Sequence, residues 1–116
     1  MHERTVYKIT TGELWRTAEA AGRFVGAPVD LADGFIHFST ADQVEETGRR
    51  HFSGQDDLVL VAVDATRLGA DLRWEPSRGG DLFPHLYAPL DLAAVISVAS
   101  LPRAASGALD FSGLLP

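Results

Sequence analysis

The sequence contains no cysteine, and this absence excludes several kinds of chemistry. The protein forms no disulfide, has no thiolate nucleophile and cannot hold zinc through thiolates. A cysteine-free chain also fits a reducing compartment. Lysine is scarce as well, since Lys8 is the only lysine beside nine arginines.

Positive charge is in deficit overall, because 10 Lys and Arg face 16 Asp and Glu and give a formal net charge of −6. A broad cationic surface that holds a nucleic-acid backbone is therefore not expected. A local arginine cluster is still sufficient to bind a single phosphate. We expect a small-molecule or nucleotide ligand rather than a nucleic acid, and the sequence leaves the oligomeric state open.

Long hydrophobic runs are missing too. The longest run, residues 58–63, is far shorter than the roughly 20 apolar residues that cross a bilayer. Residues 1–5 carry charge where a signal peptide has its apolar stretch. We therefore expect a cytoplasmic protein with no membrane contact. The glycine motifs of serine hydrolases, phosphate-binding loops and dinucleotide-binding folds are also absent.

The remaining composition is that of an ordinary globular domain. The chain has 116 residues, of which 46% are hydrophobic and 22% are charged. A chain of this length buries roughly 65% of its unfolded surface and forms one core. We expect one domain over residues 1–101 and a loosely held tail over residues 102–116, which are rich in Pro, Gly, Ser and Ala.

The first half of the chain predicts two strands and two helices. Residues 5–10 alternate between two faces and predict a strand. The spacing of Thr10 and Glu13 is that of a capping box, which predicts a helix of about ten residues ending at Gly22. Residues 23–34 are rich in Gly, Pro and Asp and predict a loop. A second strand over residues 34–40 leads into a helix, which Thr40 and Gln43 cap and which ends before Ser53.

The second half predicts only strands and turns. Residues 58–63 predict a central strand covered on both faces. Residues 64–69 predict a turn or one helical turn. Residues 72–75 predict a short strand, and residues 76–80 a flexible glycine loop. Pro84 interrupts a strand over residues 82–87 and places it at a sheet edge or a bulge. With a last strand over residues 94–101, the fold class is α+β: two helices and about five or six strands in a mixed or antiparallel sheet.

Three polar groups are candidate site residues. His37 and Ser39 share one face of a strand that ends at a helix N-terminus, where backbone N–H groups favour an anionic or polyol ligand. Arg73 and Glu75 share a strand face and can orient a ribose or a phosphate, while Arg78 on the glycine loop can close over it. The simpler interpretations are a helix cap, a half-buried histidine and a surface ion pair.

The third group is an aromatic wall. Phe83, His85 and Tyr87 fall on one strand face and suit stacking against a flat ring, although Phe83 fits a core position equally well. The spacing of the histidines does not support a metal site, so we expect none.

Five ordered blocks of the chain resemble domain-of-unknown-function family 952, a group of small bacterial proteins. The blocks are residues 7–10, 32–40, 55–58, 73–75 and 83–90. Members of this family look similar in fold to the ADP-ribosyltransferases, whose split antiparallel sheet binds NAD in a cleft. The resemblance thus implies an ADP-ribosyltransferase-like fold and suggests NAD as the ligand, with NAD as a possible substrate.

Residue by residue, the resemblance covers part of that site. The segment 37–39 resembles a His-Gly-Ser motif whose histidine holds a ribose hydroxyl, with Phe38 in place of glycine. Tyr87 matches a stacking tyrosine by residue type. The late catalytic glutamate has no direct counterpart, because Glu75 is the last glutamate of the chain, and Glu75 takes that role only if the strand order allows it. A related branch that transfers a 2′-phosphate uses arginines and a histidine, which Arg73, Arg78 and His37 match.

Two hypotheses follow. The first is an NAD- or nucleotide-binding transferase with His37 and Glu75 as catalytic residues. Its ligand-binding residues are Ser39, Arg73, Arg78, His85 and Tyr87. The alternative is a non-catalytic module that keeps the cleft and binds a small molecule or a partner.

Overall fold

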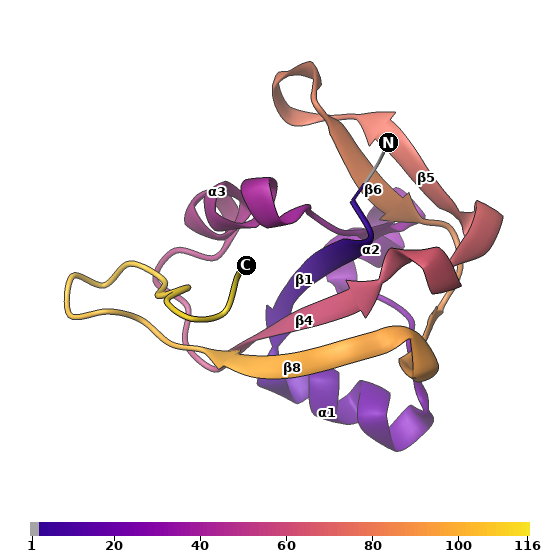
Figure 1. Cartoon of the computed structure of the whole chain (residues 1–116). Helices are drawn as coiled ribbons and strands as arrows, with labels where there is room; N and C mark the ends of the chain where they lie inside the picture. The colour runs from indigo at the N-terminus through magenta and orange to yellow at the C-terminus, as the bar shows by residue number, and fades with distance from the viewer. Residues whose placement is uncertain (1–2) are drawn as a thin grey trace.

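The computed structural model describes residues 3–116, and in this range the protein has the expected α+β fold (Figure 1). The helices are α1 (Gly12–Ala21), α2 (Pro28–Asp33) and α3 (Ala41–His51). The strands are β1 (Thr5–Thr11), β2 (Arg23–Phe24), β3 (Ile36–His37), β4 (Leu58–Asp64), β5 (Leu72–Pro76), β6 (Leu82–Leu86), β7 (Leu90–Asp91) and β8 (Val95–Leu101). Short 3₁₀ turns link several of the later strands.

The described strands form three small sheets, and every pairing in them is antiparallel. Their orders are β1-β4-β8, β3-β6-β5 and β2-β7. Figure 1 shows α1 against one side of the first sheet, with the β5–β6 hairpin projecting away from it. Tyr7 and Ser39 join the two larger sheets, since the backbone N–H of each donates to the carbonyl oxygen of the other at 2.7 and 2.9 Å.

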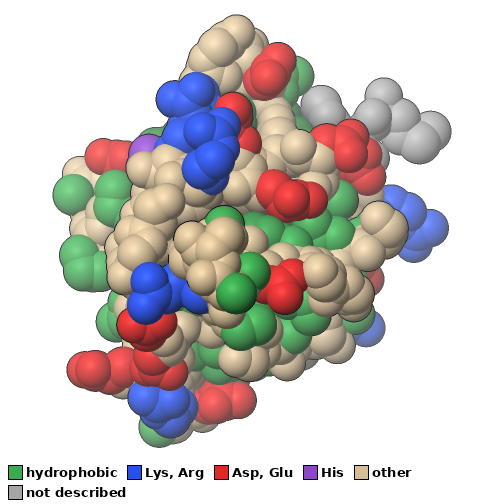
Figure 2. All heavy atoms as spheres, turned by 90° about the vertical axis from the view of Figure 1, so that its left-hand side faces the viewer, with side chains coloured by type: hydrophobic (Ala, Val, Ile, Leu, Met, Phe, Trp, Pro, Cys, Tyr) green, Lys and Arg blue, Asp and Glu red, His purple; other side chains and the backbone are tan. Residues whose placement is uncertain are grey.

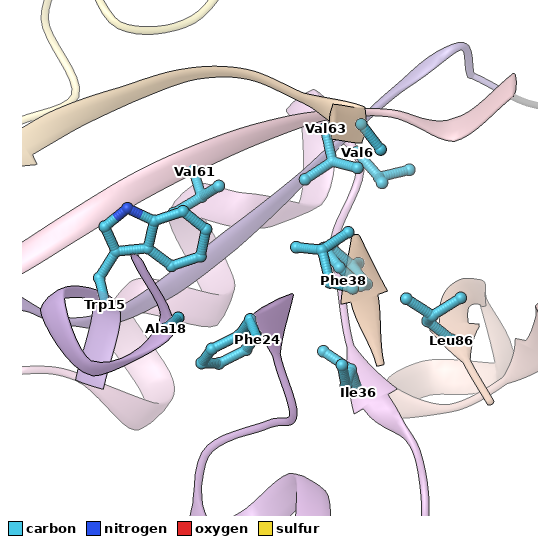
Figure 3. Close-up of a cluster of buried hydrophobic side chains, with 11 residues drawn as sticks. Val6, Trp15, Ala18, Phe24, Ile36, Phe38, Val61, Val63 and Leu86 are labelled. Atoms are coloured by element: carbon cyan, nitrogen blue, oxygen red, sulfur yellow. The ribbon is translucent and has the colours of Figure 1, made fainter. Parts of the chain in front are cut away.

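The alternation of β1 places its side chains in two separate cores. Val6 packs in the cluster with Trp15 and Ala18 of α1, as the close-up in Figure 3 shows. Tyr7 and Ile9 point to the other face and pack with Val44 of α3. The central position predicted for residues 58–63 is confirmed, because β4 lies between β1 and β8.

The predicted helices α1 and α3 are both present, but the cap of α1 is shifted by one residue. The Oγ1 atom of Thr11, not of Thr10, accepts a hydrogen bond from the backbone N–H of Leu14 at 3.1 Å. Thr10 is buried with its hydroxyl unpartnered. The cap of α3 is as predicted: Gln43 Oε1 accepts from the Thr40 N–H at 3.0 Å.

The prediction of a loop over residues 23–34 was wrong, because this stretch contains β2 and α2. Its turn-forming residues act as helix boundaries. Pro28 occupies the first turn of α2, where its missing N–H costs nothing. Asp30 accepts from the Ala27 N–H at 2.7 Å, and Gly34 ends the helix with a left-handed φ of 87°.

The prediction that Pro84 places its strand at a sheet edge or a bulge was also wrong, because β6 is the middle strand of β3-β6-β5 and pairs with β5 without a register shift. The Pro84 carbonyl accepts from the Phe38 N–H at 3.0 Å. In an antiparallel strand, the N and C=O of one residue point to the same side. The missing N–H therefore faces Phe38, just past the end of the two-residue β3, so the proline gives up only the reciprocal bond of this last pair and leaves the pairing of β5 with β6 intact.

The segment 102–116 contacts the body of the protein. Leu109 and Phe111 pack against the second core, and a Cβ added at Gly48 of α3 would lie 3.0 and 3.2 Å from these two side chains. Arg103 makes two hydrogen bonds to Asp56, at 2.8 and 3.0 Å. The domain boundary at residue 101 stays a prediction. Among residues 3–116, no helix has the length and apolar character to span a membrane.

Candidate functional site

A cavity of about 620 Å³ runs along the outer edge of β1, between the two larger sheets. β1, β3, β6, α3 and the N-terminal ends of α1 and α2 form its walls. Residues 7–11 of β1 line it. Pockets that hold small organic ligands have volumes of roughly 300–1,000 Å³, so this cavity has the size of a ligand site.

The cavity brings together some of the predicted site residues and not others. His37, Ser39, Arg78 and His85 line it. Arg73, Glu75 and Tyr87 do not, and they lie behind His85 on the β5–β6 side. The predicted groups thus divide into a cavity wall and a layer that supports it.

Both ring nitrogens of His37 are engaged by carboxylates. Nδ1 lies 2.6 Å from Asp30 Oδ1, and Nε2 lies 2.9 Å from Asp33 Oδ2. Ionised carboxylates only accept hydrogen bonds, so both contacts form when both nitrogens carry protons. The predicted ribose contact of His37 requires a ligand to displace Asp33, whose side chain is 49% exposed.

A buried ion pair that the sequence analysis missed anchors this side of the cavity. The ammonium nitrogen of Lys8 lies 2.9 Å from both carboxylate oxygens of Asp30, and both residues are buried. Burial lowers the pKa of Lys8, an effect that Asp30 partly offsets. Burial raises the pKa of Asp30, but the hydrogen bond from His37 and the charge and hydrogen bond of Lys8 outweigh it and lower that pKa to about 2. The one available signal was the inward-facing position of the single lysine on β1.

A guanidinium and two hydroxyls meet where α3 borders the cavity. Arg78 Nε lies 3.1 Å from a carboxylate oxygen of Glu46, and Arg78 Nη1 lies 3.4 Å from Thr47 Oγ1. Thr47 Oγ1 also lies 2.9 Å from Ser39 Oγ. The Arg78 guanidinium sits over the Phe83 ring, 4.9 Å from its centroid. This group offers charge-assisted donors to an anion.

The predicted flexible loop that carries Arg78 is a closed hairpin turn. The Ser77 N–H donates to the Asp81 carbonyl at 2.9 Å, and the Gly80 N–H donates to the Ser77 carbonyl at 2.8 Å. Gly79 supplies the left-handed φ of 69° that the turn requires. From this turn the Arg78 guanidinium contacts two side chains of α3, Glu46 and Thr47.

Behind the cavity, Glu75 Oε1 accepts two hydrogen bonds, from His85 Nδ1 at 2.8 Å and from the Tyr87 hydroxyl at 2.7 Å. The hydrogen bonds from Tyr87 and His85 lower the pKa of Glu75. The hydrogen bond that Tyr87 donates to Glu75 raises the pKa of Tyr87. Arg73 lies over the Tyr87 ring, 4.4 Å from its centroid.

A side chain from the segment just before β3 packs against the predicted aromatic wall. Phe35 stacks on His85 with ring centroids 4.1 Å apart, and it lies 5.2 Å from the Tyr87 ring. In this structure Phe35, from the same molecule, occupies the stacking position beside Tyr87. Sequence periodicity could not find this contact, because it depends on the pairing of β3 with β6.

On the face drawn in Figure 2, charges of one sign do not gather in a single patch: Lys and Arg side chains lie in separate groups, interleaved with Asp and Glu. Within residues 3–116, no three His, Asp or Glu side chains are grouped so as to hold a metal ion.

The family model for a protein of unknown function, DUF952, matches residues 9–98 of this chain. The chain belongs to this family. No curated protein matched it.

Three similar solved structures are of one protein, CC0527 from Caulobacter crescentus. Its crystal structure is 50% identical in sequence with a TM-score of 0.90, covering 93% of this chain and 95% of that chain. A double mutant is 48% identical with a TM-score of 0.89 and the same coverage. The solution NMR structure is 49% identical with a TM-score of 0.86, covering 97% of each chain.

Proposed function

We propose that this member of the DUF952 family binds a small organic anion, with a nucleotide as the first ligand class to test, in the cavity beside β1. The observation that carries the proposal is the meeting of Arg78, Thr47 and Ser39 in the wall of a cavity whose surface is mostly apolar. Sites for small molecules are typically pockets with mostly apolar surface in which a small number of polar groups point at the ligand.

The size and walls of the cavity support the same proposal. Ile9, Leu14 and Phe52 provide apolar surface for a ring or chain, while the guanidinium of Arg78 suits a phosphate or carboxylate. Two antiparallel sheets beside one cavity also support an ADP-ribosyltransferase-like arrangement with NAD as a ligand. The ADP-ribosyltransferase-like arrangement and NAD as its ligand are therefore kept as proposals.

The geometry favours ligand binding over ADP-ribosyl transfer. That reaction needs a carboxylate beside the reacting sugar, where positive charge develops. Oε1 of Glu75 is engaged by His85 and Tyr87, and Glu75 does not line the cavity. A non-catalytic module, or a reaction that does not use Glu75 directly, therefore fits better. A cytoplasmic location stays a prediction that the lack of cysteine favours.

Thermal unfolding with a ligand panel tests the proposal. The panel is NAD, ADP-ribose, nucleoside phosphates and inorganic phosphate. A ligand at 100 times its Kd adds about 2.7 kcal/mol to the free energy of unfolding. We expect at least one nucleotide to raise the Tm of the wild type and to lose this effect in Arg78→Gln.

The matched control is Arg49→Gln. Arg49 also pairs with Glu46, at 2.8 Å, but it does not line the cavity. Arg49→Gln should keep the full ligand-induced rise in Tm. No rise with any nucleotide would refute nucleotide binding, and an equal loss in both variants would refute the role given to Arg78. Release of nicotinamide from NAD would restore the transferase hypothesis.

A further inference from the structure

One imidazole nitrogen in the cavity wall has no hydrogen-bond partner. The His85 side chain is 7% exposed and lines the cavity. Its Nδ1 is bonded to Glu75, whereas its Nε2 makes no hydrogen bond within residues 3–116. The fully enclosed unpartnered side-chain atoms of this range are Thr10 Oγ1 and Trp15 Nε1, so His85 Nε2 retains access to open space. Because His85 lines the cavity and its Nδ1 is bonded to Glu75, which does not, the opposite ring nitrogen Nε2 is the one placed to face the cavity.

The partners of His85 fix which nitrogen is basic. An ionised carboxylate only accepts, so Glu75 holds the proton of the neutral ring on Nδ1 and leaves the lone pair on Nε2. The Tyr87 hydroxyl donates to the same Glu75 oxygen and holds it in place. Phe35 stacks on the ring face at 4.1 Å and fixes the ring plane.

His37 is the contrasting case within the same wall. Its ring lies 5.6 Å from that of His85, yet carboxylates engage both of its nitrogens. A ligand therefore meets a free imidazole nitrogen at His85 and an occupied one at His37.

We propose that Nε2 of His85 is the proton acceptor of the cavity, with Glu75 and Tyr87 as positioning residues. This inference rests on the proposed function, since it requires a small molecule in the cavity. The ligand presents a hydroxyl to Nε2 and its anionic group to Arg78, as a sugar phosphate or nucleoside phosphate does.

Where a proton is transferred, the hydroxyl O–H bond breaks and its electron pair stays on the oxygen. The proton then forms a bond to Nε2. Glu75 stays ionised and stabilises the imidazolium through Nδ1. The group thereby activates an oxygen of the ligand, or a water beside it, without an external oxidant or reductant.

The tautomer of His85 tests the positioning roles in the protein without ligand. Long-range ¹H–¹⁵N correlation spectra of the full-length protein report which ring nitrogen carries the proton, and His85→Gln assigns the signals. We expect the Nδ1–H tautomer in the wild type, its loss in Glu75→Ala and its retention in Glu75→Gln, which keeps an acceptor oxygen. An Nε2–H tautomer in the wild type would overturn the proposal.

Chemical reactivity tests whether Nε2 is free. Diethyl pyrocarbonate transfers an ethoxycarbonyl group to an unprotonated ring nitrogen, and the ethyl carbonate that leaves takes up a proton and breaks down to ethanol and carbon dioxide. At mildly alkaline pH, peptide mass spectrometry should show modification of His85 and of the exposed His51, with His37 modified several-fold more slowly. A His85 that reacts as slowly as His37 would contradict a free Nε2.

Repeating the modification with a ligand present separates this inference from the proposed function. A nucleoside phosphate that raises the Tm should slow the modification of His85 in the wild type and leave it unchanged in Arg78→Gln, the variant expected not to bind it. If no panel member binds, the proposed function fails, while the tautomer and the reactivity still decide whether His85 is held as a base. Binding without protection of His85 refutes the inference alone.

Discussion

At the scale of single residues, the carboxylate of Asp30 is the acceptor that joins several polar groups beside the cavity. Its carboxylate accepts from Lys8 Nζ, from His37 Nδ1 and from the backbone N–H groups of Ala27 and His37. It thereby connects β1, β3 and the start of α2. A buried carboxylate with this many donors is expected to matter more for folding than for contact with a ligand.

Replacing Asp30 should therefore be strongly destabilising. Removing one partner of a buried ion pair leaves an uncompensated charge, here Lys8, and costs about 3–5 kcal/mol. We expect Asp30→Ala to lower the free energy of unfolding in urea by about this amount. The control is Asp33→Ala, whose carboxylate is half exposed and should cost less than 1 kcal/mol, roughly the value of a surface pair. Equal losses would contradict the buried-pair account.

The free energy of unfolding should depend on pH in the range where Asp30 titrates. Its pKa is lowered from 3.8 to about 2 in the folded protein, so the unfolded state binds more protons between these values. The stabilisation is fully present above the unfolded pKa and is lost as the pH falls through the folded pKa. Urea unfolding at a series of pH values should show the gap between wild type and Asp30→Asn closing as the pH falls from about 4 to about 2. A gap that does not change over this range would refute the assignment.

Tyr87 should titrate abnormally because of Glu75. The hydrogen bond to Glu75 raises the pKa of Tyr87 above 10.0, and burial and the negative charge of Glu75 add to the effect. The stabilisation from this bond is thus present below pH 10 and lost as the pH rises through the folded pKa. Alkaline absorbance titration in a Tyr7→Phe background isolates Tyr87. Glu75→Gln should lower its pKa toward 10, and an unchanged titration curve would contradict the bond.

At the scale of elements, two adjacent threonines at the start of α1 have different roles. Thr11 caps the helix, whereas Thr10 buries an unpartnered hydroxyl. Thr11→Val removes the cap and should cost about 0.5–2 kcal/mol. Thr10→Val keeps the shape, removes a buried unpaired polar group and should be neutral or stabilising. Urea unfolding of both variants tests the pair, and a greater loss at Thr10 would restore the cap that its spacing predicts.

Local signals explain which elements the sequence predicts. α1, α3 and the central strand β4 follow from caps and apolar periodicity within a few residues. α2 was missed because its Pro, Asp and Gly are also turn residues. The position of β6 was missed because it depends on β3, a partner more than 40 residues away in the sequence.

The same distinction holds for the candidate site. His37, Ser39, Arg78 and His85 were predictable as polar residues near strand ends and turns, and they line the cavity. The Lys8–Asp30 pair spans 22 residues and leaves no periodic signal. The support of His85 by Glu75 depends on the register of β5 with β6, which no local pattern specifies.

At the scale of the whole molecule, the two larger sheets meet at one backbone bridge, and the cavity lies beside it. The bridge between Tyr7 and Ser39 holds the edge of β1 close to the start of α3. Both sheets contribute to the cavity walls, so the fold itself creates the site. The segment 102–116 adds side chains to the core on the α3 face.

Truncation after Leu101 tests the role of that segment. The deletion removes the packing of Leu109 and Phe111 against Gly48 and the two hydrogen bonds from Arg103 to Asp56. From these contacts we expect a lower Tm for the shortened chain with its fold retained, measured by calorimetry and far-UV circular dichroism. An unchanged Tm would support a loosely held tail and a domain that ends at residue 101.

The central claim is that the cavity beside β1 is a ligand site. The most direct measurement is a ¹H–¹⁵N chemical-shift titration of the full-length protein with ADP-ribose and, separately, with inorganic phosphate. The account predicts that shift changes concentrate at Tyr7, Ser39, Thr47, Arg78 and His85, while the amides of β8, which does not line the cavity, stay constant. Saturating shifts confined to β8, or no shifts with either compound at millimolar concentration, would contradict it.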